Sequence, residues 1–343
     1  MAKQIHHRAT RADVAKVAGT SVAVVSYVVN NGPRPVAPAT RERVLAAIKS
    51  TGYRPNSVAR ALASGTTRTY GLVVPNIGNA FIASLAHELQ QQALANDMVM
   101  LLGDAGDSRK RELQLINNLL GQQVNGLFYI SVDRHPYIDL LQSSGTPFVM
   151  LDRVDPSLQV NVIRVDEREA SRQVTAHLLS HGYQHVGIIC GPPEMLNTQD
   201  RLQGWRDALA DHGVEERPEW IFHTPYTRVG GYQAAQRMMQ SETRPRALFA
   251  SNEAQEIGCI RALSEHRIRV PDQLALVCFN GTDQSAYHVP SLTTVRQPVR
   301  EMAKTAINML AAWKGESMLS EFSHHLELGE SCGCKLADNK ITI

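Results

Sequence analysis

Long apolar runs are absent from this chain of 343 residues. No run approaches the roughly 20 residues that span a membrane, and the opening stretch, MAKQIHHRAT, lacks the apolar region of a signal peptide. A hydrophobic content of 43% and a charged content of 20% are typical of globular proteins. We therefore expect a cytoplasmic protein, and its length favours two or three folded units over one small domain.

Cysteine is scarce, with five residues in the chain. Cys190, Cys259 and Cys278 stand singly in apolar runs, where a buried free thiol is expected. Cys332 and Cys334 form the motif SCGC near the end of the sequence. A Cys-x-Cys motif without a second cysteine pair or a histidine cluster at ligand spacing argues against zinc. The sequence therefore predicts reduced thiols, no metal site and no cofactor.

Catalytic signatures are also missing. The chain contains no GxGxxG, no P-loop, no HExxH and no GxSxG motif. The 13 histidines are scattered, and the two adjacent pairs, at 6–7 and 324–325, have no carboxylate or cysteine at ligand spacing. These absences predict a protein that is not an enzyme.

Charge of one sign is unevenly spread along the chain. Residues 1–65 contain ten lysines and arginines against only Asp13 and Glu42, a net charge of +8. Because the whole chain carries +2, the remaining residues carry −6. A small basic unit attached to a larger acidic one is the charge pattern of a DNA-binding head on a separate body.

The basic segment begins with two short helices. Thr10 is a helix cap with Asp13 three residues later, and Gly19 ends this first helix. Its predicted apolar face consists of Val14, Ala15, Val17 and Ala18. Ser21 caps the next helix after a turn of only a few residues. Two short helices joined by a tight turn that contains glycine indicate a helix-turn-helix.

The second helix has an unusual composition, SVAVVSYVVNN. Valine favours strands, but Val25, Val28 and Val29 stand at i, i+3 and i+4, so they form one stripe that packs on the first helix. The opposite face carries Val22, Ala23, Ser26 and Tyr27. This face is small and uncharged, and such side chains suit the DNA major groove, where they contact thymine methyls and base edges.

A third helix follows in PATRERVLAAIKSTGY, with Val44, Leu45 and Ile48 together on its apolar side and its end at Gly52. The next segment, RPNSVARALASG, is rich in alanine and too short to be a stable helix alone. It is expected to fold only against another surface. The alternative for the whole region is three packed helices with a basic surface and no DNA site.

The segments DVAKVAGTSVAVVSYVVN and RERVLAAIKSTGYRPNSVARAL resemble the head of the LacI/GalR family of bacterial transcription regulators, and the similarity extends along almost the whole chain. The resemblance implies that the hinge folds on DNA and that Leu62 wedges into the minor groove and kinks the duplex. Most members carry arginine where Tyr27 stands, which implies a different half-site sequence. The DNA-binding residues implied are Ser21, Val22, Ala23, Ser26, Tyr27, Asn30, Arg54, Asn56, Ala59 and Leu62.

From Thr69 onward, continuous apolar strands alternate with helices, which predicts parallel sheets covered on both faces. The resemblance implies a periplasmic-binding-protein type I fold, with two α/β subdomains joined by crossing strands and a small-molecule cleft between them. Strand carboxyl ends would face that cleft. The expected domains are residues 1–56 (helix-turn-helix, all α), 57–67 (hinge helix and linker) and 68–343 (α/β effector-binding and dimerisation domain).

The predicted effector-binding residues stand just after strands. They are Asn79, Phe81, Asp133, Arg201, Tyr226, Asn252, Asn280 and Gln297. Arg201 matches the hydroxyl-binding arginine of the family, and Tyr226 a position that is often aromatic. Each of the polar residues could instead be a cap or turn residue. The motif FNG places Asn280 where the family has a sugar-binding aspartate, and Glu256 replaces a small residue, which implies a less common ligand.

These features together predict a sequence-specific DNA-binding regulator that acts as a homodimer on a near-palindromic operator. We expect a repressor controlled by a carbohydrate-like effector bound between the subdomains. The alternative is an effector-independent, architectural DNA-binding protein with a vestigial cleft. A secreted sugar-binding protein is disfavoured because the chain has a basic head and no secretion signal.

Overall fold

A computed structural model describes residues 9–30, 34–56, 67–151, 155 and 158–334 of the chain. The chain divides into two compact units, residues 1–67 and 68–343. The first is the basic helical segment, called the head below. The second is the α/β segment, called the body.

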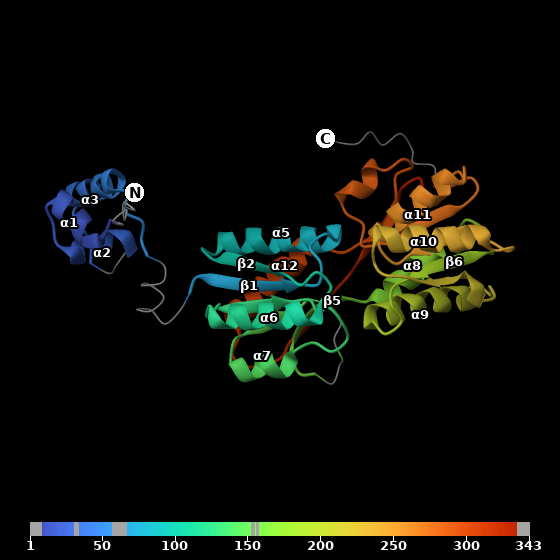
Figure 1. The fold of residues 1–343 in the computed structure, drawn as a ribbon, viewed down its shortest axis with the longest axis horizontal. Coiled ribbons are helices and arrows are strands. Elements are labelled where there is room, and N and C mark those ends of the chain that lie inside the picture. The colour runs from blue at the N-terminus through green and yellow to red at the C-terminus, as the bar shows by residue number, and fades with distance from the viewer. Residues whose placement is uncertain (1–8, 31–33, 57–66, 152–154, 156–157, 335–343) are drawn as a thin grey trace, which may run out of the picture. The chain divides into compact units, whose positions relative to one another are not determined.

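The head contains α1 (Arg11–Ala18), α2 (Val22–Asn30) and α3 (Pro38–Thr51) (Figure 1). The predicted cap of α1 is a full capping box, because Thr10 Oγ1 accepts from Asp13 N at 3.3 Å and Thr10 N donates to Asp13 Oδ2 at 2.8 Å. Gly19 ends α1 at φ +61°, a left-handed conformation that favours glycine. The chain then bends by 106° between α1 and α2, as a helix-turn-helix requires.

The head has its own small core. The predicted valine stripe of α2 is confirmed, because Val25 and Val28 are buried and Val29 packs beside them. Two predicted core positions are wrong: Val17 is 60% exposed and Leu45 is 50% exposed. Each stands next to a buried residue, Ala18 or Val44, and neighbours on a helix point about 100° apart. The core consists of Val14, Ala15, Ala18, Val25, Val28, Val44, Ala47 and Tyr53.

The N-terminal lobe of the body is built on a six-stranded, entirely parallel sheet in the order β11-β5-β4-β3-β1-β2. Its strands are β1 (Thr69–Val74), β2 (Val99–Asp104), β3 (Gly126–Tyr129), β4 (Phe148–Met150), β5 (Asn161–Val165) and β11 (Leu319–Phe322). Its helices are α5 (Ala80–Ala95), α6 (Arg109–Gly121), α7 (Ile138–Ser144) and α12 (Val299–Ala312). Helices α5 and α12 cover one face of this sheet, and α6 and α7 cover the other (Figure 1).

The C-terminal lobe repeats this plan with a sheet in the order β12-β10-β9-β8-β6-β7, in which only β12 is antiparallel to its neighbour. Its strands are β6 (Val186–Cys190), β7 (Ile221–His223), β8 (Ala247–Ala250), β9 (Ala275–Phe279), β10 (Thr293–Arg296) and β12 (His325–Glu327). Its helices are α8 (Glu167–Ser180), α9 (Leu196–Asp211), α10 (Arg228–Gln240) and α11 (Glu253–Glu265), with short 3-10 turns η1 (Pro218–Trp220) and η2 (Asp283–Tyr287). Helices α8 and α9 pack on one face, and α10 and α11 on the other.

The chain passes between the lobes three times, after β5, after β10 and after β11. One apolar core runs through both lobes, from α5 and α12 to α8 and α9. Central strands such as β3, β6, β8 and β9 are buried along their whole length, because helices cover both faces. The expected fold of two α/β subdomains joined by crossing segments is therefore confirmed.

Within the part of the chain that the structure describes, no single helix is both long and apolar enough to cross a membrane. Helices α1 and α2 reach the length and apolar content of a membrane span only when taken together, and the chain bends by 106° between them.

Candidate DNA interface and effector site

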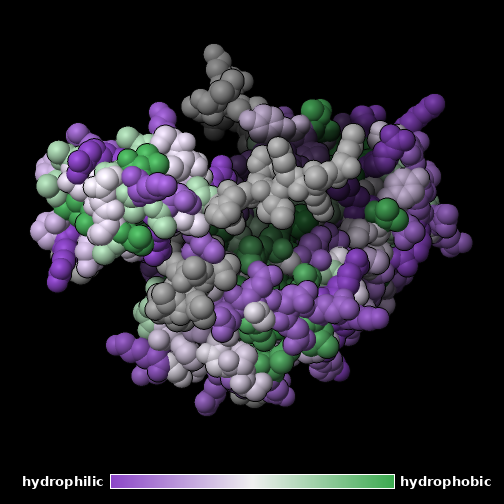
Figure 2. Space-filling model, turned by 60° about the vertical axis from the view of Figure 1, so that its left-hand side comes forward, coloured by the Kyte–Doolittle hydropathy of each residue, from purple (hydrophilic) through white to green (hydrophobic). Residues whose placement is uncertain are grey.

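The surface of α2 opposite its valine stripe is small and uncharged. Val22 is 46% exposed, Ala23 is exposed, and Ser26 and Tyr27 are partly exposed. Ser21 Oγ accepts from Val24 N at 3.3 Å, so Ser21 caps the start of α2. Figure 2 shows hydrophobic residues among hydrophilic ones on the surface of the head. The amino end of α2 therefore presents side chains that suit base edges and thymine methyls.

The carboxyl end of α2 and the segment after α3 hold the other predicted DNA contacts. Asn30 is exposed and its Nδ2 donates to Ser26 Oγ at 3.2 Å. Tyr53 is buried, and its hydroxyl accepts from Arg11 Nε at 3.2 Å, which ties the segment after α3 to α1. Arg54 and Asn56 follow in exposed positions.

The head also carries exposed cations: Lys16, Arg34, Arg41, Arg43, Lys49 and Arg54. Such side chains can neutralise DNA phosphates. Ala59 and Leu62, predicted for the hinge over residues 57–67, lie outside the described residues, so their roles stay predictions.

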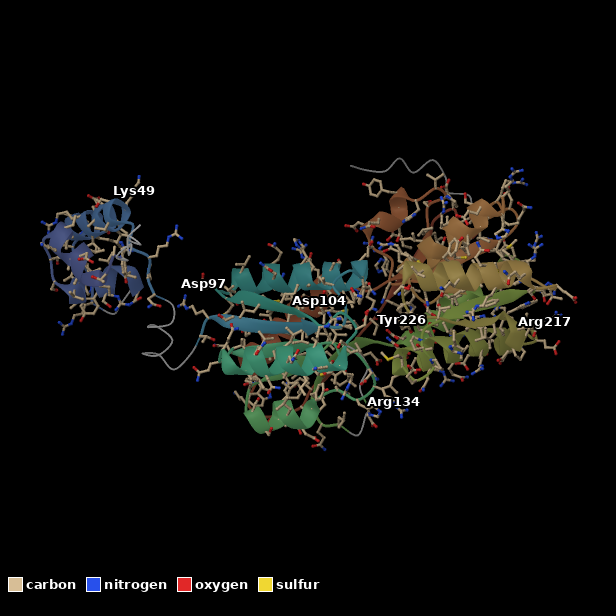
Figure 3. All side chains as sticks on the ribbon, in the orientation of Figure 1. Lys49, Asp97, Asp104, Arg134, Arg217 and Tyr226 are labelled. Carbon is tan, nitrogen blue, oxygen red and sulfur yellow. The ribbon has the colours of Figure 1, made fainter. Side chains whose placement is uncertain are left out.

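In the body, the carboxyl ends of both sheets lie on the sides of the lobes that meet. Figure 3 shows this for two strands, because Asp97 and Asp104 bracket β2, and Arg217 and Tyr226 bracket β7. Asp104 ends β2 and Tyr226 follows β7, and both stand near the boundary between the lobes. Asp97 and Arg217, which precede these strands, stand at the far ends. Ligand groups gather at this edge in open α/β sheets.

Arg201, on α9, is 3% exposed and stands at the centre of a buried polar group. Its Nε and Nη2 donate to the carboxylate of Glu167 at 3.1 and 2.7 Å, and its Nη1 donates to the backbone oxygen of Ser251 at 2.6 Å. The guanidinium lies 4.2 Å from the ring centre of Phe279 and 5.6 Å from that of Tyr226. Arg201 thus joins α8, α9 and the ends of β8 and β9.

Tyr226 follows β7, and its ring lies against the backbone at the end of β6. A Cβ atom on Gly191 would stand 2.1 Å from the Tyr226 ring, so only glycine fits there. The Tyr226 hydroxyl shares a hydrogen bond of 2.7 Å with Thr198 Oγ1, and it donates to Asn197 Oδ1 at 3.3 Å. Burial raises the pKa of this phenol, so it stays protonated as a donor.

Asn280 and Gln297 form an amide pair across the ends of β9 and β10. Gln297 Nε2 donates to Asn280 Oδ1 at 2.5 Å. Asn280 has φ +61°, a left-handed conformation that asparagine accepts more readily than most residues. The pair leaves one amide oxygen and amide hydrogens for further hydrogen bonds of either polarity.

Two predicted effector residues have local structural roles. Asn79 caps α5, with its Oδ1 accepting from Phe81 N at 3.0 Å. Asn252 caps α11, with its Oδ1 accepting from Gln255 N at 2.7 Å and its Nδ2 donating to Tyr226 O at 3.3 Å. The side chain of Phe81 packs against the apolar core. Effector contacts by these three residues stay predictions.

Asp133 stands after β3 in a network of its own. It pairs with Arg109 at 2.7 Å and accepts from His135 N at 2.8 Å. The guanidinium of Arg109 also lies 4.3 Å from the ring centre of Tyr137. Asp133 is therefore held by Arg109 at the carboxyl edge of the N-terminal sheet, and its effector contact stays a prediction.

Sequence reasoning missed two carboxylates that organise this region, Glu167 and Glu253. Glu167, the partner of Arg201, starts α8 directly after a lobe crossing. Glu253 accepts from Thr282 N, Thr282 Oγ1 and Ser285 Oγ, at 3.1, 2.9 and 2.6 Å. Glu256, which the sequence marks as a departure from the family, is 0% exposed, and neither of its oxygens has a hydrogen-bond partner among the described residues. No local motif marks such residues, because burial and partners depend on packing.

The expectation that SCGC lacks nearby histidines is wrong. His177 and His181 of α8 lie beside Cys332 and Cys334 in the folded chain. The signal was present in the sequence as a histidine pair spaced i, i+4, in the stretch HLLSH, about 150 residues away from the cysteines. Only the fold brings the two pairs together.

Comparison with known proteins agrees with this architecture. Residues 10–56 match the family "Bacterial regulatory proteins, lacI family", and residues 175–321 match a "Periplasmic binding protein-like domain". Catabolite control protein A of Priestia megaterium is 30% identical over 325 residues, which is 93% of this chain and 98% of that protein.

Two solved structures are also similar. The complex of the transcriptional regulator CelR with cellobiose has a TM-score of 0.71 and 29% identity, and covers 94% of this chain and 100% of that one. The Lac repressor dimer bound to operator and the anti-inducer ONPF has a TM-score of 0.81 and 25% identity, and covers 95% and 99%. The chain thus belongs to the lacI family of bacterial regulatory proteins, as a DNA-binding transcriptional regulator with an effector-binding body.

Proposed function

We propose that the protein is a repressor that binds a near-palindromic operator as a homodimer, with one head on each half-site. The observation that carries this proposal is the small, uncharged face at the start of α2 within a head of high positive charge. Cations around the face bind phosphates, while Val22, Ala23 and Tyr27 contact bases. The similar Lac repressor structure is a dimer bound to operator.

Arg54 and Asn56 bind the DNA backbone in this proposal, because they follow the anchored Tyr53 and stand exposed at the end of the head. Ser21, Ser26 and Asn30 supply polar contacts along α2, and the helix start also favours phosphate. Tyr27 in place of the arginine common in the family replaces a cation with a bulky phenol, which disfavours the guanine contact that arginine makes.

The body binds a carbohydrate-like effector at the carboxyl ends of the two sheets. Tyr226 offers a ring for stacking, and Asn280 with Gln297 offers amide donors and acceptors. Asn79, Phe81, Asp133, Arg201 and Asn252 complete the proposed site. CelR, one of the similar structures, is bound to cellobiose.

Effector binding is coupled to DNA binding through the three crossings between the lobes. An effector that contacts both lobes favours one lobe arrangement, and it changes operator affinity only if it binds the two arrangements unequally. We place this switch in the cytoplasm, where the chromosome is accessible. The curated relatives are transcriptional regulators, which supports the inference that this protein is not an enzyme.

A thermal-shift screen of the full-length protein tests the effector. The panel contains monosaccharides, disaccharides, phosphorylated sugars and nucleosides. A ligand at 100 times its Kd stabilises by about 2.7 kcal/mol, which raises Tm by about 5 °C for a folded unit of the size of the body. Gln297→Ala should abolish the shift, whereas Gln90→Ala, on the exposed side of α5, should retain it. No shift with any class would favour the effector-independent alternative.

A further inference from the structure

Four side chains from two distant parts of the sequence converge in the C-terminal lobe. His177 stands in the last turn of α8 and His181 is the C-cap residue of that helix. Cys332 and Cys334 follow β12 in the final part of the described chain. One ligand atom from each of the four residues lies within 4.8 Å of all the others.

The distances match a tetrahedral metal centre. His177 Nε2 lies 3.3 Å from His181 Nε2 and 3.3 Å from Cys332 Sγ. Cys334 Sγ lies 3.6 Å from His177 Nε2 and 3.4 Å from His181 Nε2. Zinc bonds of about 2.3 Å to sulfur and about 2.05 Å to nitrogen require N–N edges of about 3.3 Å and S–N edges of about 3.6 Å. Four of the six edges are therefore close to those of a tetrahedral zinc site, and the other two, from Cys332 to Cys334 and to His181, are no longer than 4.8 Å.

The backbone brings the two histidines together and the two cysteines together. His177 and His181 are spaced i, i+4, so their rings leave the same side of the helix. Gly333, between the cysteines, has φ +96°, a conformation that side-chain-bearing residues rarely adopt. This turn brings the thiols of Cys332 and Cys334 to the same point.

A supporting contact stands behind the buried thiol. Thr293 Oγ1, on β10, lies 3.0 Å from Cys332 Sγ, and it accepts from Gly329 N at 2.8 Å. Its one hydroxyl proton has two acceptors at 3.0 Å, Gly329 O and Cys332 Sγ. A Cys332 thiolate is the charged acceptor of the two, and a hydrogen bond to it orients and stabilises a metal ligand. Cys332 is fully buried, whereas Cys334 is partly exposed and His181 is exposed, so an ion can enter from solvent.

We propose that His177, His181, Cys332 and Cys334 bind one zinc ion. Two imidazoles and two thiolates form a complete tetrahedral set, as in structural zinc sites. His177 stands ten residues after Glu167, which is about 15 Å along α8, so the ion lies at the opposite end of this helix from Arg201. It fastens the segment after β12 to α8 and takes no part in effector binding. This inference is independent of the proposed function.

The test uses the untagged full-length protein, purified under reducing conditions and freed of weakly bound metal by gel filtration. Metal analysis should give one zinc per chain. After removal of zinc with a chelator, Co²⁺ should bind one per chain. The cobalt-bound protein should show the visible absorption bands of a tetrahedral site and a thiolate-to-metal charge-transfer band in the near ultraviolet. Zinc should then displace cobalt and abolish both signals.

Variants locate the site. Cys334→Ser and His181→Ala change the two more exposed ligands, and each should lower zinc affinity by more than about 100-fold, the upper range for loss of a supporting contact alone. His87→Ala, an exposed histidine on α5 of the other lobe, should bind zinc as the wild type does. Zinc should raise Tm of the chelator-treated wild type and leave Tm of Cys334→Ser unchanged.

Three results would overturn the proposal. The first is a Cys332–Cys334 disulfide in place of bound metal in protein purified under reducing conditions. The second is bound cobalt with an octahedral spectrum and no charge transfer. The third is zinc binding by Cys334→Ser as tight as that of the wild type, since that would place the ion elsewhere.

Discussion

Glu256→Gln should remove a cost of folding that grows with pH. Glu256 lies in the first turn of α11, fully buried, beside the thiol of Cys278 and near the carboxylate of Glu253. Burial, together with repulsion from Glu253, raises the pKa of Glu256 from its ordinary 4.5 to about 8, and burial is the larger cause. The neighbouring carboxylate of Glu253 accepts hydrogen bonds from Thr282 N and Ser285 Oγ.

The sign follows from proton binding. Between pH 4.5 and about 8 the folded chain keeps a proton on Glu256 that the unfolded chain has lost, so stability falls as pH rises. The slope is about 1.4 kcal/mol per pH unit well inside this window. From pH 5.5 to pH 7.5 the loss amounts to about 2.5 kcal/mol for the wild type. Glutamine has no such proton to lose and keeps nearly the same shape.

The assay is urea unfolding of both full-length proteins at the two pH values and at equal concentration. It is followed by tryptophan fluorescence, because Trp205 and Trp220 are buried in the C-terminal lobe. The free energy of unfolding of Glu256→Gln minus that of the wild type should rise by about 2.5 kcal/mol. Glu219→Gln, at an exposed position, gives the baseline for the loss of one carboxylate. A difference for Glu256→Gln that stays constant between the two pH values would refute the reasoning.

Three further predictions concern the head and the buried ion pair. Val25→Ala should cost the head about 1.5 to 3 kcal/mol, whereas Val22→Ala, on the exposed face of the same helix, should cost under about 0.5 kcal/mol, measured by thermal unfolding. Equal costs would contradict the packing of α2. Glu167→Gln should destabilise the body by about 3 to 5 kcal/mol, because the charge of Arg201 stays buried with a neutral partner, and urea unfolding measures this. Tyr27→Ala should relax base preference, whereas Arg54→Ala should weaken binding to all DNA about equally and lower the salt dependence, as measured by fluorescence anisotropy on specific and random duplexes. Equal loss on random DNA in both variants would exclude base reading by Tyr27.

In the head, local sequence pattern predicts the helix caps and the buried side of α2. Thr10, Asp13 and Gly19 define α1 through contacts within a few residues, so the caps could be predicted from the sequence. The valine stripe of α2 was equally clear, although valine favours strands, because its spacing matches a helix. The errors at Val17 and Leu45 concern which side of a helix meets its neighbours, which depends on how the three helices cross.

The body shows where prediction from sequence stops. Apolar runs that alternate with helices predicted the sheets, and the resemblance supplied the crossings between lobes. The pairing of Arg201 with Glu167, and the four-residue cluster of His177, His181, Cys332 and Cys334, join segments at least 34 residues apart. Such contacts are set by strand order and helix packing, which local spacing does not report. Asn79 and Asn252 proved to be caps, the alternative that residue type alone left open.

The most direct test of the central claim is selection of bound sites from a random double-stranded DNA library by the full-length protein at near-physiological salt. The account predicts two inverted half-sites, about 10 base pairs apart from centre to centre, with a flexible pyrimidine–purine step in the middle. Binding that yields no consensus sequence would contradict it, and would leave α2 as a packing element in a head that holds phosphate alone.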